Sequence, residues 1–392
     1  MTTPHSAEPS NTTNGHSRGT PLISAQLETS SHNAPSVEGS PANQDLPRSG
    51  RAELARRPAG EELHPLSSAQ LLRPIRPAPR SGWRGIVYSA SAGMINPGES
   101  SSDRARRELI ARINQPLHGC YRIAALSLKG GVGKTVTAAL LGATFASLRG
   151  DRVVALDANP DRGTLSQRVP LETSATVRHL LEDADRITRY SDVRAYTSQA
   201  PSRLEVLASE QDPAVSRAFS REDYWKAVDL LARHHNIIIT DCGTGLLHDA
   251  LQGTIAVADA LLIVSSPAID GARSAWATLD WLEAHGYSEL VRRSVTVING
   301  VRPRRGNVDV EQVCSQFARR CREVVRIPFD RHLDEGGVID LDRLATRTRD
   351  ALLDLAAVVS DDFARTSPHA GHRRRTIATL PPGPITDPTS PQ

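Results

Sequence analysis

A glycine-rich segment narrows the range of folds for this chain more than anything else in its sequence. It reads Lys129-Gly130-Gly131-Val132-Gly133-Lys134-Thr135, and it joins an apolar run, Tyr121 to Leu128, to a helix-like run, Val136 to Leu148. Glycines let backbone N–H groups turn toward phosphate oxygens without a Cβ atom in the way. The N-terminus of the following helix adds partial positive charge. A strand, a loop that ends in Gly-Lys-Thr and a helix are together typical of a phosphate-binding loop.

The two side chains that end this segment have the chemistry that nucleotide binding needs. Lys134 is long enough to reach the β- and γ-phosphates of a nucleotide, and the hydroxyl of Thr135 is a suitable ligand for Mg²⁺. We therefore expect Mg-ATP to bind at this loop.

A second apolar run ends in a carboxylate. The residues Asn236 to Thr240 read as a buried strand, and Asp241 follows them. A carboxylate at the end of such a strand can hold Mg²⁺ through a water molecule. The compact stretch Cys242 to Gly245 then has the position of a loop that responds to the γ-phosphate.

Apolar runs alternate with helical patterns through the middle of the chain. The predicted strands are Arg122–Ser127, Val153–Asp157, Leu204–Leu207, Ile237–Asp241, Ala260–Val264, Val295–Ile298 and Val324–Ile327. The predicted helices include Tyr224–His234, Gly271–His285, Val308–Arg322 and Leu341–Ala364. Most of the strands are continuously apolar, as in sheets that are covered on both faces. The alternation predicts an α/β fold of the P-loop NTPase type, a doubly wound, mostly parallel sheet of about seven strands.

Composition divides the chain into four parts. Residues 1–81 are rich in Pro, Ser, Asn, Thr and Gly, and no aromatic residue precedes Trp83, so we expect disorder there. Residues 82–119 form a basic lead-in with a predicted helix from Ser102 to Ile113, which either packs on the main domain or forms a separate binding surface. Residues 120–366 form the globular domain, and residues 367–392 form a second disordered tail.

Charge, cysteines and hydropathy give no sign of a strongly basic nucleic-acid binder, a zinc protein, a secreted protein or a membrane protein. The formal net charge is only +3, so overall charge does not predict nucleic-acid binding. The four cysteines are scattered without the spacing of a zinc site, as in a reduced, cytoplasmic protein. The sequence shows neither an apolar signal segment nor a run long enough to cross a bilayer, so we expect a cytoplasmic protein with no transmembrane segment.

Lys129 adds a second lysine to the phosphate-binding loop. With it the string KGGVGKT resembles the deviant Walker A motif of the MinD/ParA ATPase family, and the resemblance covers residues 120–366. It implies a P-loop ATPase that forms a homodimer on binding ATP, with Lys129 reaching the partner's nucleotide. Two positions depart from the pattern: Leu128 stands in place of the first glycine of the general motif, and Val136 replaces the family's common second threonine. The candidate phosphate site therefore includes all residues from Lys129 to Val136.

The strand Val153–Asp157 leads into a segment that resembles the family's switch I. Asp157 matches an acidic residue near the metal, so the expected metal ligands are Thr135, Asp157 and Asp241. Asn159 matches the family's water-activating aspartate, and an amide cannot accept a proton as a carboxylate does. The resemblance therefore implies slow hydrolysis, unless Asp161, two residues on, replaces the missing carboxylate.

Two later segments resemble the family's base-recognition loops. Asn299 follows the predicted strand Val295–Ile298 and matches a position that reads the adenine edge. Pro328 and Phe329, within Ile327 to Asp330, match the loop that covers the adenine. Asn and Pro are also common at the turns that follow strands.

Within the family, three segments resemble the MinD-like ATPases of actinobacterial type VII (ESX) secretion loci: Leu126 to Leu128, Asp157 to Leu165 and Asp241 to Leu246. Asn159 would then be a subfamily trait. The resemblance implies an accessory or regulatory ATPase with a protein partner at the secretion machinery. One alternative is a partition-type ATPase that binds DNA nonspecifically. Its candidate phosphate contacts are Arg302, Arg304, Arg305, Arg319, Arg320, Arg322 and Arg326. A membrane-cycling septum-positioning ATPase fits least, because Pro-rich sequence rather than an amphipathic helix follows Leu341–Ala364.

Overall fold

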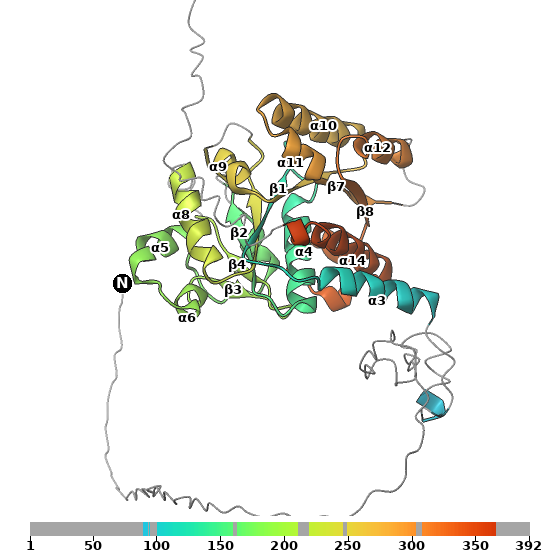
Figure 1. Ribbon diagram of the computed structural model, residues 1–392, viewed down its shortest axis with the longest axis horizontal. Helices are drawn as coiled ribbons and strands as arrows, with labels where there is room; N and C mark the ends of the chain where they lie inside the picture. The colour runs from blue at the N-terminus through green and yellow to red at the C-terminus, as the bar shows by residue number, and fades with distance from the viewer. Residues whose placement is uncertain are drawn as a thin grey trace, which may run out of the picture. The chain divides into compact units, whose positions relative to one another are not determined.

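The computed structural model describes residues 89–92, 94, 100–159, 163–210, 219–245, 249–302 and 308–365 (Figure 1). The two predicted disordered parts, 1–81 and 367–392, lie outside the described residues, and so does most of the lead-in before Ser100.

A single sheet of eight strands runs through the described domain, in the order β3-β4-β2-β5-β1-β6-β7-β8. The strands are β1 (Tyr121–Leu126), β2 (Val153–Ala158), β3 (Ser198–Gln199), β4 (Glu205–Leu207), β5 (Ile237–Cys242), β6 (Ala260–Ser265), β7 (Val295–Val301) and β8 (Glu323–Pro328). Every neighbouring pair is parallel except β3 and β4. The predicted fold class is confirmed, as are all seven predicted strands, while the two-residue edge strand β3 was not predicted.

Helices cover both faces of this sheet. The larger helices are α3 (Ser101–Ile113), α4 (Lys134–Leu148), α8 (Arg221–Ala232), α9 (Asp249–Val257), α10 (Ile269–Ala284), α12 (Val310–Phe317) and α14 (Thr346–Ser360). Shorter ones are α5 (Val177–Glu182), α6 (Tyr190–Arg194), α11 (Ser288–Arg293), α13 (Arg331–Asp334) and the 3₁₀ turns η1 (Leu165–Arg168), η2 (Ala184–Arg186), η3 (Leu341–Arg343) and η4 (Phe363–Arg365). Successive residues of a strand point to opposite faces, so each strand contributes side chains to two cores. Ile123 and Ala125 of β1 belong to the core with α3, α4 and α14, whereas Ala124 and Leu126 belong to the core with α9, α10 and α12.

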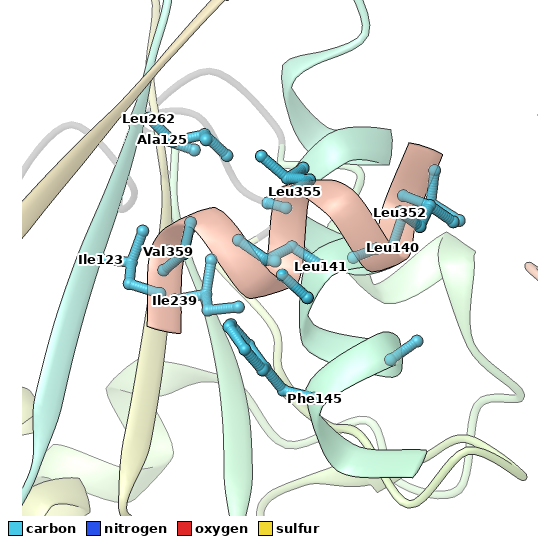
Figure 2. Packing of buried hydrophobic residues seen from close by; sticks show 14 of the residues in the cluster. Ile123, Ala125, Leu140, Leu141, Phe145, Ile239, Leu262, Leu352, Leu355 and Val359 are labelled. Carbon is cyan, nitrogen blue, oxygen red and sulfur yellow. The ribbon is translucent and has the colours of Figure 1, made fainter. Parts of the chain in front are cut away.

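The helix that follows the glycine-rich loop is held by the main core. Figure 2 shows α4 and α14 with their apolar side chains packed together and against the strands. Leu140, Leu141 and Phe145 of α4 are fully buried in this cluster, as is Leu355 of α14. Because α4 is buried along most of its length, its N-terminus and the loop before it have a fixed position at the carboxyl end of β1.

The lead-in helix α3 packs along α14, and the two run side by side in Figure 1. Ile113, the last residue of α3, is completely buried in the core. Arg112 donates two hydrogen bonds to the carboxylate of Asp361, with N···O distances of 3.1 and 2.5 Å. Of the two interpretations left open for this helix, these contacts favour packing on the main domain.

Two predicted helices are shorter than expected. The predicted helix Val308–Arg322 is present only as α12, which ends at Phe317. The predicted helix Leu341–Ala364 is divided into η3, α14 and η4. The division before α14 has a local cause: Asp330 accepts a hydrogen bond from the N–H of Ala345 at 3.0 Å, and Ala345 has a non-helical ψ of 145°. Within the described part of the chain, no helix combines the length and apolar character needed to cross a membrane.

Candidate phosphate-binding site

The predicted phosphate-binding loop connects β1 to α4, and its backbone explains its glycines. Gly131 and Gly133 have φ values of +76° and +89°, in the left-handed region that residues with a side chain rarely adopt. Gly133 is the N-cap of α4 and offers no side-chain oxygen to the first N–H groups of the helix. Val132 is buried and anchors the loop, whereas Gly130 and Gly131 are exposed. The open N-terminus of α4 is therefore available to an anion.

Three of the predicted site residues meet at the base of this loop. Asp241 lies on β5, which pairs directly with β1. Its carboxylate accepts a hydrogen bond from Lys134 Nζ at 2.5 Å and another from Thr135 Oγ1 at 2.6 Å. Lys134 and Asp241 are 7 % and 0 % exposed. Two charges that are buried this deeply need to pair with each other. The pair therefore holds the side chain of Lys134 in position at the base of the loop.

The third predicted metal ligand, Asp157, lies beside them. It is the next-to-last residue of β2, lies directly opposite Asp241 in the sheet register and is 1 % exposed. Its carboxylate accepts hydrogen bonds from the N–H groups of Asn159 at 3.1 Å and Leu165 at 3.0 Å. Burial, and then the nearby charge of Asp241, raise the pKa of Asp157 above its ordinary value. Such an electrostatic strain between two carboxylates is relieved when a cation binds near both of them.

The donor set fits a divalent cation that shares its coordination with a phosphate. Thr135, Asp157 and Asp241 offer only oxygen atoms, which Mg²⁺ prefers, and Mg²⁺ commonly binds through one or two carboxylates together with substrate phosphates. Among the described residues, no group of three or more His, Cys, Asp or Glu side chains could hold a metal without such help. These residues therefore suit a metal that arrives with a nucleotide.

Gly163 is a site residue to which sequence reasoning gave no role. A Cβ atom placed on it would lie 2.0 Å from Oδ2 of Asp157, so the Asp157 carboxylate occupies the space that any other residue would need. The Gly163 N–H also donates to Ser209 Oγ at 3.1 Å. No pattern in a single sequence could have shown this contact, because it depends on the path of the chain between Asp157 and η1.

The additional lysine of the loop has a partner within the same chain. Lys129 Nζ forms an ion pair with Asp270, in the first turn of α10. The two side chains are 38 % and 66 % exposed, so solvent screens the pair. Sequence reasoning did not identify Asp270, which is 141 residues from Lys129.

Asn159 lies next to Asp157 on the wall of a cavity of about 240 Å³ between α5 and α8. The cavity is also lined by Leu181, Phe219 and Lys226. The alternative carboxylate, Asp161, lies outside the described residues.

The candidate base-recognition residues lie at the same edge of the sheet, at the ends of β7 and β8. The side-chain amide of Asn299 donates to the carbonyl of Val132 at 3.0 Å, so Asn299 contacts the phosphate-binding loop itself. Pro328 ends β8, and the N–H of Phe329 donates to the carbonyl of Val301 at 2.9 Å. The guanidinium group of Arg302 lies 3.3 Å from the centre of the Phe329 ring.

Two arginines of the predicted basic cluster between α12 and the end of β8 are neutralised. Arg320 forms ion pairs with Asp280 at 2.6 Å and Glu283 at 2.9 Å, and Arg326 pairs with Glu311. Arg304 and Arg305 lie outside the described residues. Arginines that are already paired offer less free charge to the phosphates of DNA, so this surface gives the partition-type interpretation little support.

The sequence is similar to a family of nucleotide-binding domains and to several known proteins. The profile of the CobQ/CobB/MinD/ParA nucleotide binding domain family matches residues 123–354. The ESX-1 secretion-associated protein EspI of Mycobacterium tuberculosis is 37% identical over 286 residues, covering 72% of this chain and 42% of EspI. This chain therefore spans less than half the length of that relative.

Septum site-determining protein MinD of Synechocystis is 30% identical over 181 residues, covering 46% of this chain and 65% of that protein. Among solved structures, the cell division ATPase MinD of Pyrococcus furiosus is similar, with a TM-score of 0.50 and 20% identity over 62% of this chain and 98% of that one. At that identity the likeness supports the fold alone.

Proposed function

This chain belongs to the CobQ/CobB/MinD/ParA family of nucleotide-binding domains, and from that premise we propose that it is a P-loop ATPase that acts as a slow, ATP-dependent dimerisation switch. One observation carries the proposal: Lys134 and Thr135 of the phosphate-binding loop meet Asp241 of the adjacent strand within hydrogen-bonding distance. A cation, a hydroxyl and a carboxylate that meet at such a loop support the binding of phosphates and their metal there.

On nucleotide binding, the residues at the base of the loop exchange partners. Lys134 would leave the carboxylate of Asp241 for a phosphate oxygen, and Asp241 and Thr135 would then be free to hold the metal. When bound, Mg²⁺ neutralises the charge on the β- and γ-phosphates. Asp157 stays in place, because two backbone N–H groups fix its carboxylate.

Dimerisation requires Lys129 to leave Asp270. Solvent screens an exposed pair of this kind, so its release costs little. In the proposed ATP-bound dimer, Lys129 contacts the nucleotide of the partner, as the deviant Walker A motif implies. The ion pair between Lys129 and Asp270 then belongs to the monomer alone.

Hydrolysis is slow in this proposal because Asn159 cannot accept a proton from the attacking water. A slow ATPase holds its dimer for a long time, which suits a regulatory switch better than a motor.

The similarity to EspI supports a role as an accessory or regulatory ATPase of type VII secretion, with a protein partner at the secretion machinery. Nonspecific DNA binding by the ATP-bound form ranks second, because Arg320 and Arg326 are already neutralised by carboxylates. Anisotropy of a labelled random DNA duplex with Mg-ATP and with Mg-ADP, at two salt concentrations, separates the two roles. ATP-dependent binding that weakens steeply with salt would reverse this ranking.

Nucleotide binding is tested with a fluorescent ATP analogue and Mg²⁺. We expect the full-length chain to bind it and Lys134→Ala to lose binding. Arg104→Ala is the matched control, because Arg104 is a basic residue exposed on α3. Equal binding by the Lys134→Ala variant would overturn the proposal.

Dimerisation is tested by sedimentation velocity with Mg-ATP and with Mg-ADP. The wild-type chain is expected to sediment as a dimer with ATP alone, and Lys129→Ala to bind ATP while remaining a monomer. Asp270→Asn should dimerise at least as readily as wild type, because it releases Lys129. Normal dimerisation of Lys129→Ala would show that this lysine does not act across the interface.

A further inference from the structure

We propose that Arg168 is a positioning residue that couples the metal-binding end of the nucleotide site to its base-binding end. Arg168 is the last residue of η1 and lies outside every motif that the sequence contains. The inference rests on the proposed function, because it concerns the regulation of the same site.

The turn η1 is attached to the metal-binding end through its first residue. The N–H of Leu165 donates to Oδ2 of Asp157 at 3.0 Å, and the side chain of Leu165 has no exposed surface. Because η1 has only four residues, Arg168 has little freedom to move relative to Leu165. A displacement of the Asp157 carboxylate is therefore expected to move Arg168.

Arg168 binds the segment after α13 through both its side chain and its backbone. Its Nη1 donates to the carbonyl groups of Gly336 and Gly337, the second at 3.3 Å. Its own carbonyl accepts a hydrogen bond from the N–H of Ile339 at 2.9 Å. Gly336 has a φ of +72°, which residues with a side chain rarely adopt, so this backbone has a defined shape where the guanidinium group binds.

The same segment is joined to the base-binding end by two further hydrogen bonds. Asp330, which follows Phe329, accepts from the N–H of His332 at 3.0 Å and so caps α13. His332 is buried, and its Nε2 accepts from the N–H of Asp340 at 3.0 Å. The chain from Phe329 to Asp340 is therefore closed on itself, and Arg168 binds to one side of it.

The charge of Arg168 is poorly suited to a role in stability alone. The side chain is half-buried, it forms no ion pair with any carboxylate in the described part of the chain, and its Nε–H has no hydrogen-bond partner there. Burial lowers the pKa of Arg168, and the charge of Asp241 opposes this effect. A neutral side chain could bind the same carbonyl groups without the cost of burying a charge. The guanidinium group thus lies within the electrostatic field of the metal-binding carboxylates.

These contacts form a continuous path of hydrogen bonds from Asp157 to the segment that begins at Phe329. Such a path can carry coupling between two ends of a site when both ends bias the same element. A position of the Phe329 segment that favours the base also fixes Arg168, and through Arg168 it fixes Asp157. The metal should therefore strengthen binding of the base, and the base should strengthen binding of the metal by the same factor.

The test measures how much Mg²⁺ raises the affinity of the full-length chain for ATP and for inorganic tripolyphosphate, which has no base. Isothermal titration calorimetry gives both gains. Arg168→Gln should lower the gain for ATP about five-fold or more, as expected when coupling is lost, and leave the gain for tripolyphosphate unchanged. Arg203→Gln is the matched control, because Arg203 also donates to two backbone carbonyls, those of Ala146 and Arg149, at the opposite end of α4 from the phosphate-binding loop.

A second variant disturbs the other side of the same contact. A Cβ atom on Gly336 would lie 3.8 Å from Nη1 of Arg168 and would strain the left-handed backbone there, so Gly336→Ala should also lower the gain for ATP alone. Gly286→Ala is its control, because Gly286 has a φ of +84° and a Cβ atom there meets nothing within 4 Å. This variant decides the question if Arg168→Gln does not fold.

Three results would overturn the inference: an undiminished gain for ATP in both variants, an equal loss of the gain for tripolyphosphate, or an equal loss in the control variants. An equal loss for tripolyphosphate would mean that Arg168 only supports the metal site. A wild-type chain that does not bind ATP would overturn the proposed function and this inference with it. Binding of ATP with the same gain in every variant would overturn this inference alone.

Discussion

Some residues of the site lie so close to their neighbours that a larger side chain would not fit. The clearest is at Gly163, where a Cβ atom would lie 2.0 Å from the carboxylate of Asp157. We predict that Gly163→Ala weakens Mg²⁺-dependent nucleotide binding about ten-fold or more, and lowers the free energy of unfolding by roughly 1–3 kcal/mol, because the buried carboxylate must leave its N–H partners. Fluorescent nucleotide titration and urea unfolding measure both effects. Gly150→Ala is the control, since a Cβ atom there meets no other atom within 4 Å; equal behaviour of the two variants would contradict the prediction.

A second prediction at this scale concerns the rate of turnover. Asn159→Asp introduces a carboxylate that can accept the proton of the attacking water, so we expect steady-state ATP hydrolysis to rise by about 10²-fold. Phosphate release assays measure the rate. Asn114→Asp, the same change at the C-cap of α3, should leave it unchanged. If Asn159→Asp turns over no faster than wild type, Asn159 does not limit hydrolysis.

The sequence was informative about residues that act through a motif. Lys134, Thr135, Asp157 and Asp241 were predicted, because the ends of parallel strands meet at one edge of the sheet and the motif marks those ends. The partners of these residues were not predictable. The contact of Lys129 with Asp270 joins residues far apart in the chain, and the spacing of residues gives no sign of it.

At the scale of helices and strands, a physical difference separates the elements that were predicted from those that were missed. Most of the seven predicted strands are continuous apolar runs that are buried, so hydropathy identifies them. β3 has only two residues and pairs at the edge of the sheet, so it has no apolar run. The break before α14 was missed, because the Asp330 side chain that binds the N–H of Ala345 lies outside the helical pattern.

Helix α3 gives a prediction at this scale. If α3 is part of the folded domain, Ile113→Ala should lower the free energy of unfolding by about 2–5 kcal/mol, since it leaves a cavity at a side chain with no exposed surface. Urea unfolding followed by circular dichroism measures the change. The same substitution at Ile269, which is 58 % exposed on α10, should cost much less. Equal losses for Ile113→Ala and Ile269→Ala would mean that α3 is not held by the core.

The stability of the whole molecule should depend on a polar cluster far from the site. Glu205 is almost fully buried and accepts hydrogen bonds from Tyr190 at 2.6 Å, Thr197 at 3.0 Å and His235 at 3.1 Å. Burial alone would raise the pKa of Glu205, but these bonds outweigh it and the pKa lies below its ordinary value. A carboxyl group whose pKa is lower in the folded state stabilises the protein above its unfolded pKa, and this contribution disappears as the pH falls through the folded pKa.

We therefore predict that Glu205→Gln lowers the free energy of unfolding by roughly 1–3 kcal/mol at neutral pH, and that the difference from wild type narrows below about pH 4. Urea unfolding of both proteins at several pH values measures this. Glu108→Gln, at an exposed position on α3, should differ little from wild type throughout. A difference that stays constant from pH 7 to pH 3 would show that the charge of Glu205 is not responsible.

The packing of α3 on α14 also has a consequence for the order in which the protein can fold during synthesis. Arg112 and Asp361, which join the two helices, are 249 residues apart. The ribosome releases α3 early, but its partner helix emerges only after every strand of the sheet has been made. The apolar side of α3 therefore stays exposed in the nascent chain until α14 has been made. We expect the core between α3 and α14 to form after translation and not during it.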